Sequence, residues 1–352
     1  FRLYDTYGFP IDLTKDILAE KGMTVDEDKF RELMENQRQL ARSSRKAADA
    51  ESWSSDGVGF DNIAATKFLG YTENTCDTVV SDIVCAGEHA NCASEGEKII
   101  LVLESTVFYG ESGGQVGDTG VILSDNAEIE VSDTKKTAGN VFTHYGKVVK
   151  GTVSVGDKVK ATINVARREA IRRNHTAAHL LQAGLRSVLG THVEQAGQLV
   201  TENSVRFDFT HFSALTDDEL KQVEDFVNGA ILDGIEVDNR EMPIDEAKKL
   251  GAMALFGEKY GKVVRVVAAG DRSVELCGGT HVTNTAKIGL FKIVSEASVA
   301  AGVRRIEAVT GSGILGLIAH YKNLINETAA AVKASNPEDI ARRSVQLVSE
   351  LK

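Results

Sequence analysis

Short runs of alternating apolar and polar residues, separated by glycine and aspartate turns, fill residues 75–165 of the chain. The clearest runs read TVVSDIVC, KIILVLES, GVILSD, AEIEVSD and KVKATINV. Alternation with a period of two places the apolar side chains of a strand on one face. Several short strands separated by regular turns are typical of a small β-barrel or sandwich, which is what this stretch predicts.

The rest of the chain combines helical and strand patterns. Residues 11–50 are predicted to be helical, because Thr24 and Glu27 fit a capping box that precedes apolar residues at helical spacing. A polar stretch containing serine and glycine follows and is predicted to be a linker. Helices and strands mix after about residue 165, and the tail from about residue 313 is helical again. With 352 residues the chain is too long for one compact core, so we expect an α+β multidomain protein.

Several segments after residue 165 carry specific expectations. A helix containing HTAAHLLQAGLRSVLG should end near Gly190, and VRFDFTH should form a strand with its apolar residues on one face. An amphipathic helix should begin with a capping box between Thr216 and Glu219. KVVRVVAAGDRSVELC predicts a hairpin, and IGLFKIVSEASV and GVRRIEAVTG predict two more strands of a mostly antiparallel sheet.

Composition excludes several classes of protein. Hydrophobic residues make up 42% of the chain and charged residues 26%, as in ordinary soluble globular proteins. No apolar run approaches the ~18 residues that a membrane-spanning helix needs, so we predict no membrane partner. Four cysteines are too few for a disulfide framework, which favours a reducing cytoplasm. Because the chain begins with Phe1 rather than methionine, we expect it to be an excised fragment of a longer protein.

The distribution of charge leaves a role in binding nucleic acid open. A net charge of −11 argues against a general nucleic-acid binder. Residues 161–200 nevertheless contain five arginines and only Glu169 and Glu194 as acids. This local excess of positive charge indicates either a phosphate-binding patch or a solvated helix face.

Two pairs of metal-binding side chains share the same spacing. RRNHTAAHLL, residues 172–181, places His175 and His179 one helical turn apart on one face. Cys277 and His281 in ELCGGTHV are also four residues apart, and the two glycines between them let the backbone turn so that both side chains can converge. Three imidazoles and a thiolate form a ligand set suited to Zn²⁺. The sequence therefore predicts a metal site, the alternative being an unmetallated core with hydrogen-bonded histidines.

Familiar zinc chemistries do not match this pattern. HTAAH lacks the glutamate of the H-E-x-x-H metalloprotease helix, so the motif contains no general base. The chain has no H-x-E paired with P-C-x-x-C, which disfavours a nucleobase deaminase. Four protein ligands are typical of a structural site, so catalysis would need a loose ligand or a coordination number that expands.

A glycine-rich segment, FYGESGGQVGDTG at residues 108–120, joins two β-segments. Its glycines permit close approach of the backbone to a ligand, and adjacent N–H groups can form an anion-binding nest. The alternative is a tight hairpin loop that needs positive φ angles.

Cys85, His89 and Cys92 form a second cysteine–histidine pattern, with Cys76 nearby. The pattern is compatible with a second zinc site. We favour the simpler interpretation that these cysteines pack in strands as small hydrophobic residues.

The order of these motifs resembles that of the alanyl-tRNA synthetase family. The resembling segments, which cover residues 1 to about 312, are FRLYDTYGFPIDLT, ESGGQVGDTG, RRNHTAAHLL, LGTHVEQAGQLV, RFDFTH, ELCGGTHV and GVRRIEAVTG. Two positions depart from the family pattern: Ala178 stands where many relatives have threonine, and Gln182 stands where histidine is frequent. Neither is a predicted ligand, so the predicted metal site is intact.

The resemblance implies four parts of the chain. Residues 1–55 would contain the end of the helical tRNA-binding region and a linker, and residues 56–165 would form a β-barrel. Residues 166–312 would form an α+β, zinc-containing editing domain of the threonyl/alanyl-tRNA synthetase type. Residues 313–352 would begin a helical connection to a missing C-terminal domain. The class II aminoacylation core, with its sites for ATP and Mg²⁺, would precede Phe1.

The resemblance also implies roles for individual residues. His175, His179, Cys277 and His281 would bind one Zn²⁺ per chain. Gln195 would line the editing pocket, which Gly113, Gly114 and Gln115 would border. We add two hypotheses: Thr176 assists Gln195 in recognising the substrate, and Arg167, Arg168, Arg172 and Arg173 contact phosphates of the tRNA acceptor stem.

The implied activity is editing, the hydrolysis of the ester in mischarged Ser-tRNA(Ala) and Gly-tRNA(Ala). A pocket built for a methyl side chain rejects serine poorly, by roughly 10²-fold. Serine is larger than alanine, so a second site must recognise its hydroxyl through hydrogen bonds rather than exclude it by size. Because no acidic residue accompanies the ligands, we expect zinc to position and polarise the substrate.

The full-length enzyme would attach alanine to tRNA(Ala) using ATP, whereas this fragment should not activate alanine. Three alternatives stay open: a tRNA-binding module with a purely structural zinc, a free-standing trans-editing deacylase, and a metal-dependent hydrolase of unrelated small esters. Binding of DNA is not expected.

Overall fold

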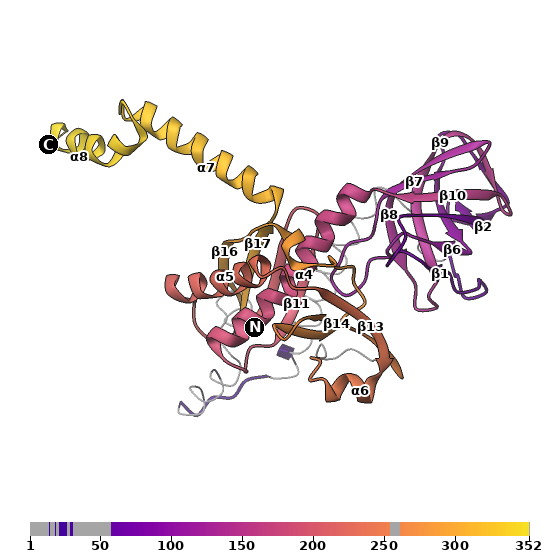
Figure 1. The fold of residues 1–352 in the computed structure, drawn as a ribbon, viewed down its shortest axis with the longest axis horizontal. Helices are drawn as coiled ribbons and strands as arrows, with labels where there is room; N and C mark the ends of the chain where they lie inside the picture. The colour runs from indigo at the N-terminus through magenta and orange to yellow at the C-terminus, as the bar shows by residue number, and fades with distance from the viewer. Residues whose placement is uncertain are drawn as a thin grey trace.

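The computed structural model describes residues 14, 18, 21–26, 29–30, 58–253 and 261–351. The expected helices of residues 11–50 therefore lie largely outside the described residues, as does the capping box that needs Glu27. A β-barrel, a central α+β unit and a helical tail follow one another along the chain (Figure 1). The predicted α+β multidomain class is confirmed for the described part.

Six antiparallel strands close into a barrel, in the order β10-β7-β8-β9-β5-β2 and back to β10. Their bounds are β2 (Thr75–Cys85), β5 (Lys98–Leu103), β7 (Gly120–Leu123), β8 (Ala127–Lys136), β9 (Phe142–Ser154) and β10 (Lys158–Ile163). Short strands are added at the margin: β3 (Glu88–Ala90) pairs with β2, β4 (Cys92–Ser94) pairs with β9, and β1 (Lys67–Phe68) runs parallel to β6 (Ser105–Thr106). Of the two predicted alternatives, a barrel and a sandwich, the structure forms the barrel.

Alternating side chains fill the barrel. In β8, Ala127, Ile129 and Val131 are buried, whereas Glu128 and Glu130 between them are exposed. This is the period of two that the sequence shows. The longest strand, β9, was not among the predicted runs.

Helix α4 (Val165–Leu189) leads directly from the barrel into the α+β unit (Figure 1). Asn164 caps its first turn, because the side-chain oxygen accepts the N–H of Arg167 at 3.0 Å. The helix ends at Gly190, whose φ of 113° is readily available only to glycine, as the sequence predicts. Two of the three predicted histidine ligands, His175 and His179, lie on this one helix.

A four-stranded antiparallel sheet packs against α4. Its order is β11 (Gln195–Val200), β12 (Val205–Thr210), β17 (Val303–Thr310) and β16 (Phe291–Ala300). Val205, Phe207 and Phe209 of β12 are buried on one face, as predicted. Helix α5 (Asp217–Leu232) begins with the predicted capping box between Thr216 and Glu219.

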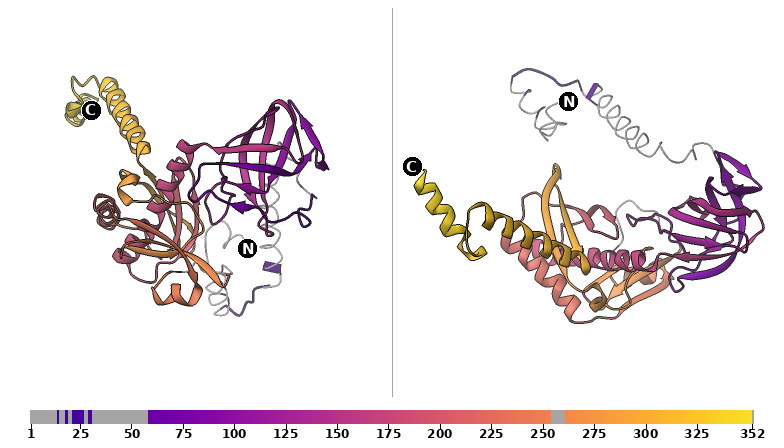
Figure 2. Two further views of the ribbon diagram at one scale, coloured as in Figure 1. Left: turned by 45° about the vertical axis from the view of Figure 1, so that its right-hand side comes forward. Right: turned by 90° about the horizontal axis from the view of Figure 1, so that it is seen from above.

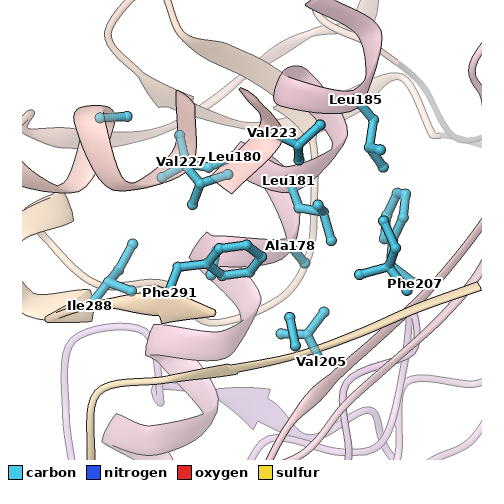
Figure 3. Packing of buried hydrophobic residues seen from close by; sticks show 14 of the residues in the cluster. Ala178, Leu180, Leu181, Leu185, Val205, Phe207, Val223, Val227, Ile288 and Phe291 are labelled. Carbon is cyan, nitrogen blue, oxygen red and sulfur yellow. The ribbon is translucent and has the colours of Figure 1, made fainter. Parts of the chain in front are cut away.

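Figure 3 shows the core between these layers. Leu181 and Leu185 of α4 lie near Phe207, and Val223 and Val227 of α5 close the other side. This apolar packing holds α4 rigidly, and with it the two histidines.

A smaller sheet presents the second ligand pair. It consists of β13 (Val237–Pro243), β14 (Val263–Ala269) and β15 (Ser273–Leu276), with α6 (Ile244–Lys249) alongside. β14 and β15 form the predicted hairpin. Cys277 follows β15 directly, and the short helix η1 (Thr285–Ile288) lies beyond His281.

The tail from residue 312 consists of α7 (Ser312–Ala331), η2 (Pro337–Asp339) and α8 (Ile340–Glu350). Both helices extend away from the α+β unit at the end opposite the barrel (Figures 1 and 2). Within the described residues, no helix is long and apolar enough to cross a membrane.

Candidate metal centre

The four predicted ligand side chains converge. Ligand atoms of His175, His179, Cys277 and His281 all lie within 4.8 Å of one another. The Sγ of Cys277 is 3.5 Å from Nε2 of His175 and 3.3 Å from Nε2 of His281. Tetrahedral zinc, with Zn–N of about 2.0–2.1 Å and Zn–S of about 2.3 Å, separates its ligand atoms by about 3.3–3.6 Å. The two distances from Sγ of Cys277 therefore fall in or near the range of a tetrahedral zinc site, within a group whose ligand atoms span up to 4.8 Å.

The close packing of the ligand loop explains one glycine of the CGGT segment. A Cβ atom on Gly279 would lie 2.0 Å from Cε1 of His175, whereas a Cβ atom on Gly278 would meet nothing within 4 Å. The backbone N–H of Gly279 also points at Sγ of Cys277, 3.3 Å away. Gly279 thus lets the loop lie directly against the first histidine.

Each imidazole has a partner on its other nitrogen. Nδ1 of His175 is 2.7 Å from Oε1 of Gln115, and Nδ1 of His281 is 3.2 Å from Oγ1 of Thr176. Nδ1 of His179 lies 3.5 Å from a carboxylate oxygen of Glu275. Metal-binding histidines almost always have such outer partners, which orient the ring. The rings of His175 and His281 are therefore held in the manner typical of metal ligands, and Glu275 lies beside the ring of His179.

The surroundings keep these histidines neutral. Burial lowers the pKa of His179 to about 3 and, assisted by neighbouring histidine and arginine charges, lowers the pKa values of His175 and His281 well below their ordinary range. Burial also raises the pKa of Glu275 to about 8. Neutral imidazole is the form that binds a metal ion, so the three histidines are in the protonation state that zinc requires.

Two further side chains hold the backbone of the ligand loop. Arg265 of β14 donates from Nη1 to the carbonyl oxygens of Cys277 and Gly279, at 2.9 and 2.7 Å. Tyr71, from the barrel, donates its hydroxyl to the carbonyl oxygen of Gly278 at 2.7 Å, and the Arg265 guanidinium lies 4.1 Å from the centre of the Tyr71 ring. The loop is thus fixed from both the sheet and the barrel.

Thr176 is buried beside the ligand group. It is 1% exposed, and its hydroxyl donates to the carbonyl oxygen of Arg172 at 3.0 Å. The same oxygen accepts the N–H of Val282 at 3.2 Å and faces Nδ1 of His281. The hydroxyl is fully used within the protein, so Thr176 is placed to orient His281.

Gln195 is the first residue of β11 and is partly buried. It pairs with Phe209, whose side chain is buried against α4. Directly opposed residues of antiparallel strands share a face, so the Gln195 side chain starts from the α4 side of the sheet. Its role in the pocket stays a prediction.

The glycine-rich segment reaches the metal centre through Gln115. Gly113 is exposed and has a φ of 57°; Gly114 has a φ of 79°, and a Cβ atom there would lie 2.5 Å from the side chain of Gln198. Gln115 itself is 0% exposed. The structure therefore brings Gln115, rather than the two glycines, to the predicted ligands.

The four predicted phosphate-binding arginines differ in their surroundings. Arg168 is completely buried and pairs with Asp118, so no part of it can meet a phosphate. Arg167 pairs with Glu202 and Arg172 with Glu169, with 19% and 14% of their side chains exposed. Within the described residues, no carboxylate pairs with Arg173.

The second cysteine–histidine pattern is not gathered as a ligand set. His89 contacts Asp82 through Nδ1 at 2.8 Å, and Cys92 is exposed. Within the described ranges, one group of three or more potential metal ligands is found, and it is the set on α4 and the CGGT loop.

Sequence reasoning missed the outer partners Glu275, Thr280, Arg265 and Tyr71. Glu275 offered a signal, because it is a carboxylate two residues before Cys277 in a strand. Tyr71 offered none, because it lies 207 residues from Gly278 in the chain.

Comparisons with known proteins agree with the resemblance read from the motifs. Residues 1–167 match the family model of class II (A) tRNA synthetases, and residues 264–307 match the second additional domain of threonyl and alanyl tRNA synthetases. The second match includes Cys277 and His281. Proteins named alanine–tRNA ligase from Acetivibrio thermocellus, Clostridioides difficile and Bacillus velezensis are 49%, 48% and 47% identical over all of this chain. The chain spans 40% of the length of each of these relatives. It therefore belongs to the alanyl-tRNA synthetase family.

Proposed function

We propose that this chain is an editing unit that hydrolyses the ester of Ser-tRNA(Ala) and Gly-tRNA(Ala) at a zinc ion held by His175, His179, Cys277 and His281. A zinc ion supplies Lewis-acid polarisation of an ester carbonyl or a water molecule. The remaining tasks, which are to orient the ligands, recognise the serine hydroxyl and hold the tRNA, fall to the side chains of the chain.

One observation carries the proposal. The ligand atoms of three neutral imidazoles and a thiol gather within 4.8 Å, His175 and His281 each hydrogen-bond to a separate partner through Nδ1, and Nδ1 of His179 faces Glu275. A packed core does not need three histidines at one point, because buried polar groups cost free energy unless they are paired. A metal site accounts for both the residue types and their orientation.

Discrimination of serine from alanine falls to Gln195 in this proposal. Its side chain starts from the α4 side of β11, the side on which the histidines lie. A side-chain amide can both donate to and accept from a hydroxyl, and these bonds are lost when the substrate carries a methyl group. A site that hydrogen-bonds a hydroxyl discriminates strongly against analogues without it.

The acceptor end of tRNA(Ala) is the proposed partner. Arg173 is the best-placed phosphate contact, because it is partly exposed and has no acidic partner within the described residues. Arg167 and Arg172 contribute less, since each is already paired with a glutamate. Arg168 is left out because it is buried.

The names of the relatives extend the proposal to the whole protein. We infer that it attaches alanine to tRNA(Ala) with ATP and Mg²⁺ in a separate aminoacylation core, and that it acts in the cytoplasm. Residues 56–165 and 166–312 are the proposed barrel and editing domains, flanked by residues 1–55 and 313–352.

Deacylation of three charged tRNAs tests the proposal. The 352-residue chain is incubated with Ser-tRNA(Ala), Gly-tRNA(Ala) and Ala-tRNA(Ala), with and without a zinc chelator. We expect the first two to be hydrolysed, the third to be spared, and the chelator to abolish hydrolysis. Equal hydrolysis of all three charged tRNAs would contradict the proposal. So would a zinc-loaded chain that binds tRNA but does not hydrolyse Ser-tRNA(Ala).

A second candidate is a tRNA-binding module with a structural zinc. It is favoured by the number of protein ligands, because four of them leave a tetrahedral ion without an open position. This candidate predicts tRNA binding without deacylation and loss of stability on chelation. The same assay separates the two candidates.

A further inference from the structure

We propose that Gln115, on the glycine-rich segment between β6 and β7, is a positioning residue for the metal centre. It fixes the ring of His175 so that Nε2 faces the metal, and it holds the loop that carries Cys277. This inference rests on the proposed function, because it assumes that the four side chains bind zinc.

The hydrogen bonds of Gln115 determine which atoms face the histidine. The backbone N–H of Thr280, which can only donate, points at Oε1 of Gln115 at 2.9 Å. Nε2 of Gln115 donates to Oγ1 of Thr280 at 3.0 Å. The amide therefore has one orientation, in which its oxygen lies 2.7 Å from Nδ1 of His175.

This orientation selects one tautomer of His175. An amide oxygen only accepts, so Nδ1 must carry the hydrogen and Nε2 keeps a free lone pair. Nε2 is the atom that lies 3.5 Å from Sγ of Cys277, on the inner side of the ligand group. The bond thus prepares His175 as a ligand before a metal arrives.

The glycines of the segment explain how a barrel residue reaches this position. The backbone N–H of Val200 donates to the carbonyl oxygen of Gly114 at 2.7 Å, and the N–H of Val116 donates to Val200 at 3.1 Å. The segment therefore adds to the edge of β11, next to Gln198. Only glycine fits at position 114, because its φ is positive and a Cβ atom would lie 2.6 Å from the Gln198 carbonyl oxygen. The role of the glycines is to carry Gln115 inward.

A single amide thereby joins the two halves of the ligand set. His175 lies on α4, and Thr280 lies between Cys277 and His281; Gln115 contacts both and is completely buried. Outer partners of this kind typically change metal affinity by about 10–100-fold when removed. We therefore expect the barrel to contribute directly to the affinity of the metal centre.

Three variants of the 352-residue chain test this role by zinc affinity, measured in competition with a chromophoric chelator. Gln115→Met keeps the volume but loses the acceptor, and we expect about 10–100-fold weaker zinc binding. Gln115→Glu keeps an acceptor for Nδ1, and we expect affinity at or above that of the unmodified chain. Gln198→Met is the matched control: it loses only a hydrogen bond to the Gly113 carbonyl oxygen, and we expect no change.

The metal-free chain provides the second readout. A merely structural role would lower the unfolding free energy of apo Gln115→Met and apo Gln115→Glu alike. The two variants would then also bind zinc with the same affinity. Normal zinc affinity in Gln115→Glu, together with weak affinity in Gln115→Met, supports positioning of His175 through Nδ1. If Gln115→Met does not fold, the test rests on the zinc affinity of Gln115→Glu. Weak zinc binding by a folded Gln115→Glu overturns the inference.

Failure of the inference differs from failure of the proposed function. If the unmodified chain and folded Gln115→Met bind zinc with equal affinity, the role of Gln115 is overturned but the metal centre is not. Absence of zinc binding by the unmodified chain overturns the metal centre, and the inference with it.

Discussion

Arg168 of α4 and Asp118 of the barrel form a buried ion pair, in which 0% and 2% of the two side chains are exposed to solvent. The Arg168 guanidinium also donates to the carbonyl oxygens of Gly70 and Val107, at 2.7 and 2.9 Å. This pair ties the first turn of α4 to the barrel. It explains why an arginine expected to meet phosphate is absent from the surface.

Arg168→Met should lower the unfolding free energy by about 3–5 kcal/mol, because it leaves the Asp118 carboxylate buried without a partner. Urea unfolding measures the change. The double variant Arg168→Met/Asp118→Asn should cost less than the sum of the single variants, since both remove the same interaction. Arg342→Ala, which breaks an ion pair whose arginine is 75% exposed, should change stability by less than about 1 kcal/mol. A similar small effect for Arg168→Met would refute a stabilising role for the buried pair.

The two glycines of CGGT should respond differently to alanine. Gly279→Ala places a Cβ atom within 2.4 Å of Nδ1 of His175, so the ring must move and zinc affinity should fall on the order of 100-fold. Gly278→Ala meets no atom within 4 Å and should bind zinc normally. Zinc titration of both variants checks this, and equal affinities would show that the loop does not pack against His175 as described.

Stability should depend on pH through His144, which lies inside the barrel. Its Nδ1 donates to the Leu101 carbonyl oxygen at 2.9 Å and its Nε2 lies 2.8 Å from Oγ1 of Thr106; burial lowers its pKa from 6.5 to about 4. Between these pH values the unfolded chain binds a proton that the folded chain does not. The unfolding free energy should therefore fall as pH drops from 6.5 towards 4, by up to about 3 kcal/mol from this residue.

His144→Gln should flatten that dependence. Denaturant unfolding at a series of pH values, with the same metal content in both proteins, isolates the contribution of His144. Parallel curves for the variant and the unmodified chain would rule out a neutral buried His144.

Arg173→Ala should weaken tRNA binding and reduce the slope of log affinity against log salt concentration by about 0.7–0.9, the effect of one phosphate contact. Arg343→Ala, on α8, should leave the slope unchanged. Filter binding at several salt concentrations provides the measurement, and an unaltered slope for Arg173→Ala would remove it from the proposed phosphate contacts.

The barrel strands whose apolar pattern is contained in their own sequence were predicted correctly. The strands β8 and β10 were readable because apolar residues alternate within each one, and β2, β5 and β7 because each carries a short apolar run between turn residues. β9 was not, because Gly146 and Gly151 interrupt its pattern. Gly146 lies against the Glu130 carbonyl oxygen, where a Cβ atom would be 2.4 Å away, so its reason lies in the neighbouring strand.

The ligand set was predictable for the same reason. Residues four apart on a helix share a face, and Cys277 and His281 enclose a glycine turn. The outer partners were not predictable, since Gln115 and Thr280 are 165 residues apart and meet only in the folded chain. Burial of Arg168 is likewise a tertiary property that the charge pattern does not encode.

X-ray absorption at the zinc edge tests the central claim most directly, because it reports the atoms around the metal in the intact chain. We predict one zinc per chain with three nitrogen neighbours at about 2.0–2.1 Å and one sulfur at about 2.3 Å. Cys277→Ser should remove the sulfur signal and leave the nitrogen signal. A spectrum of the unmodified chain without sulfur, or with oxygen neighbours alone, would contradict a metal centre built from these four side chains.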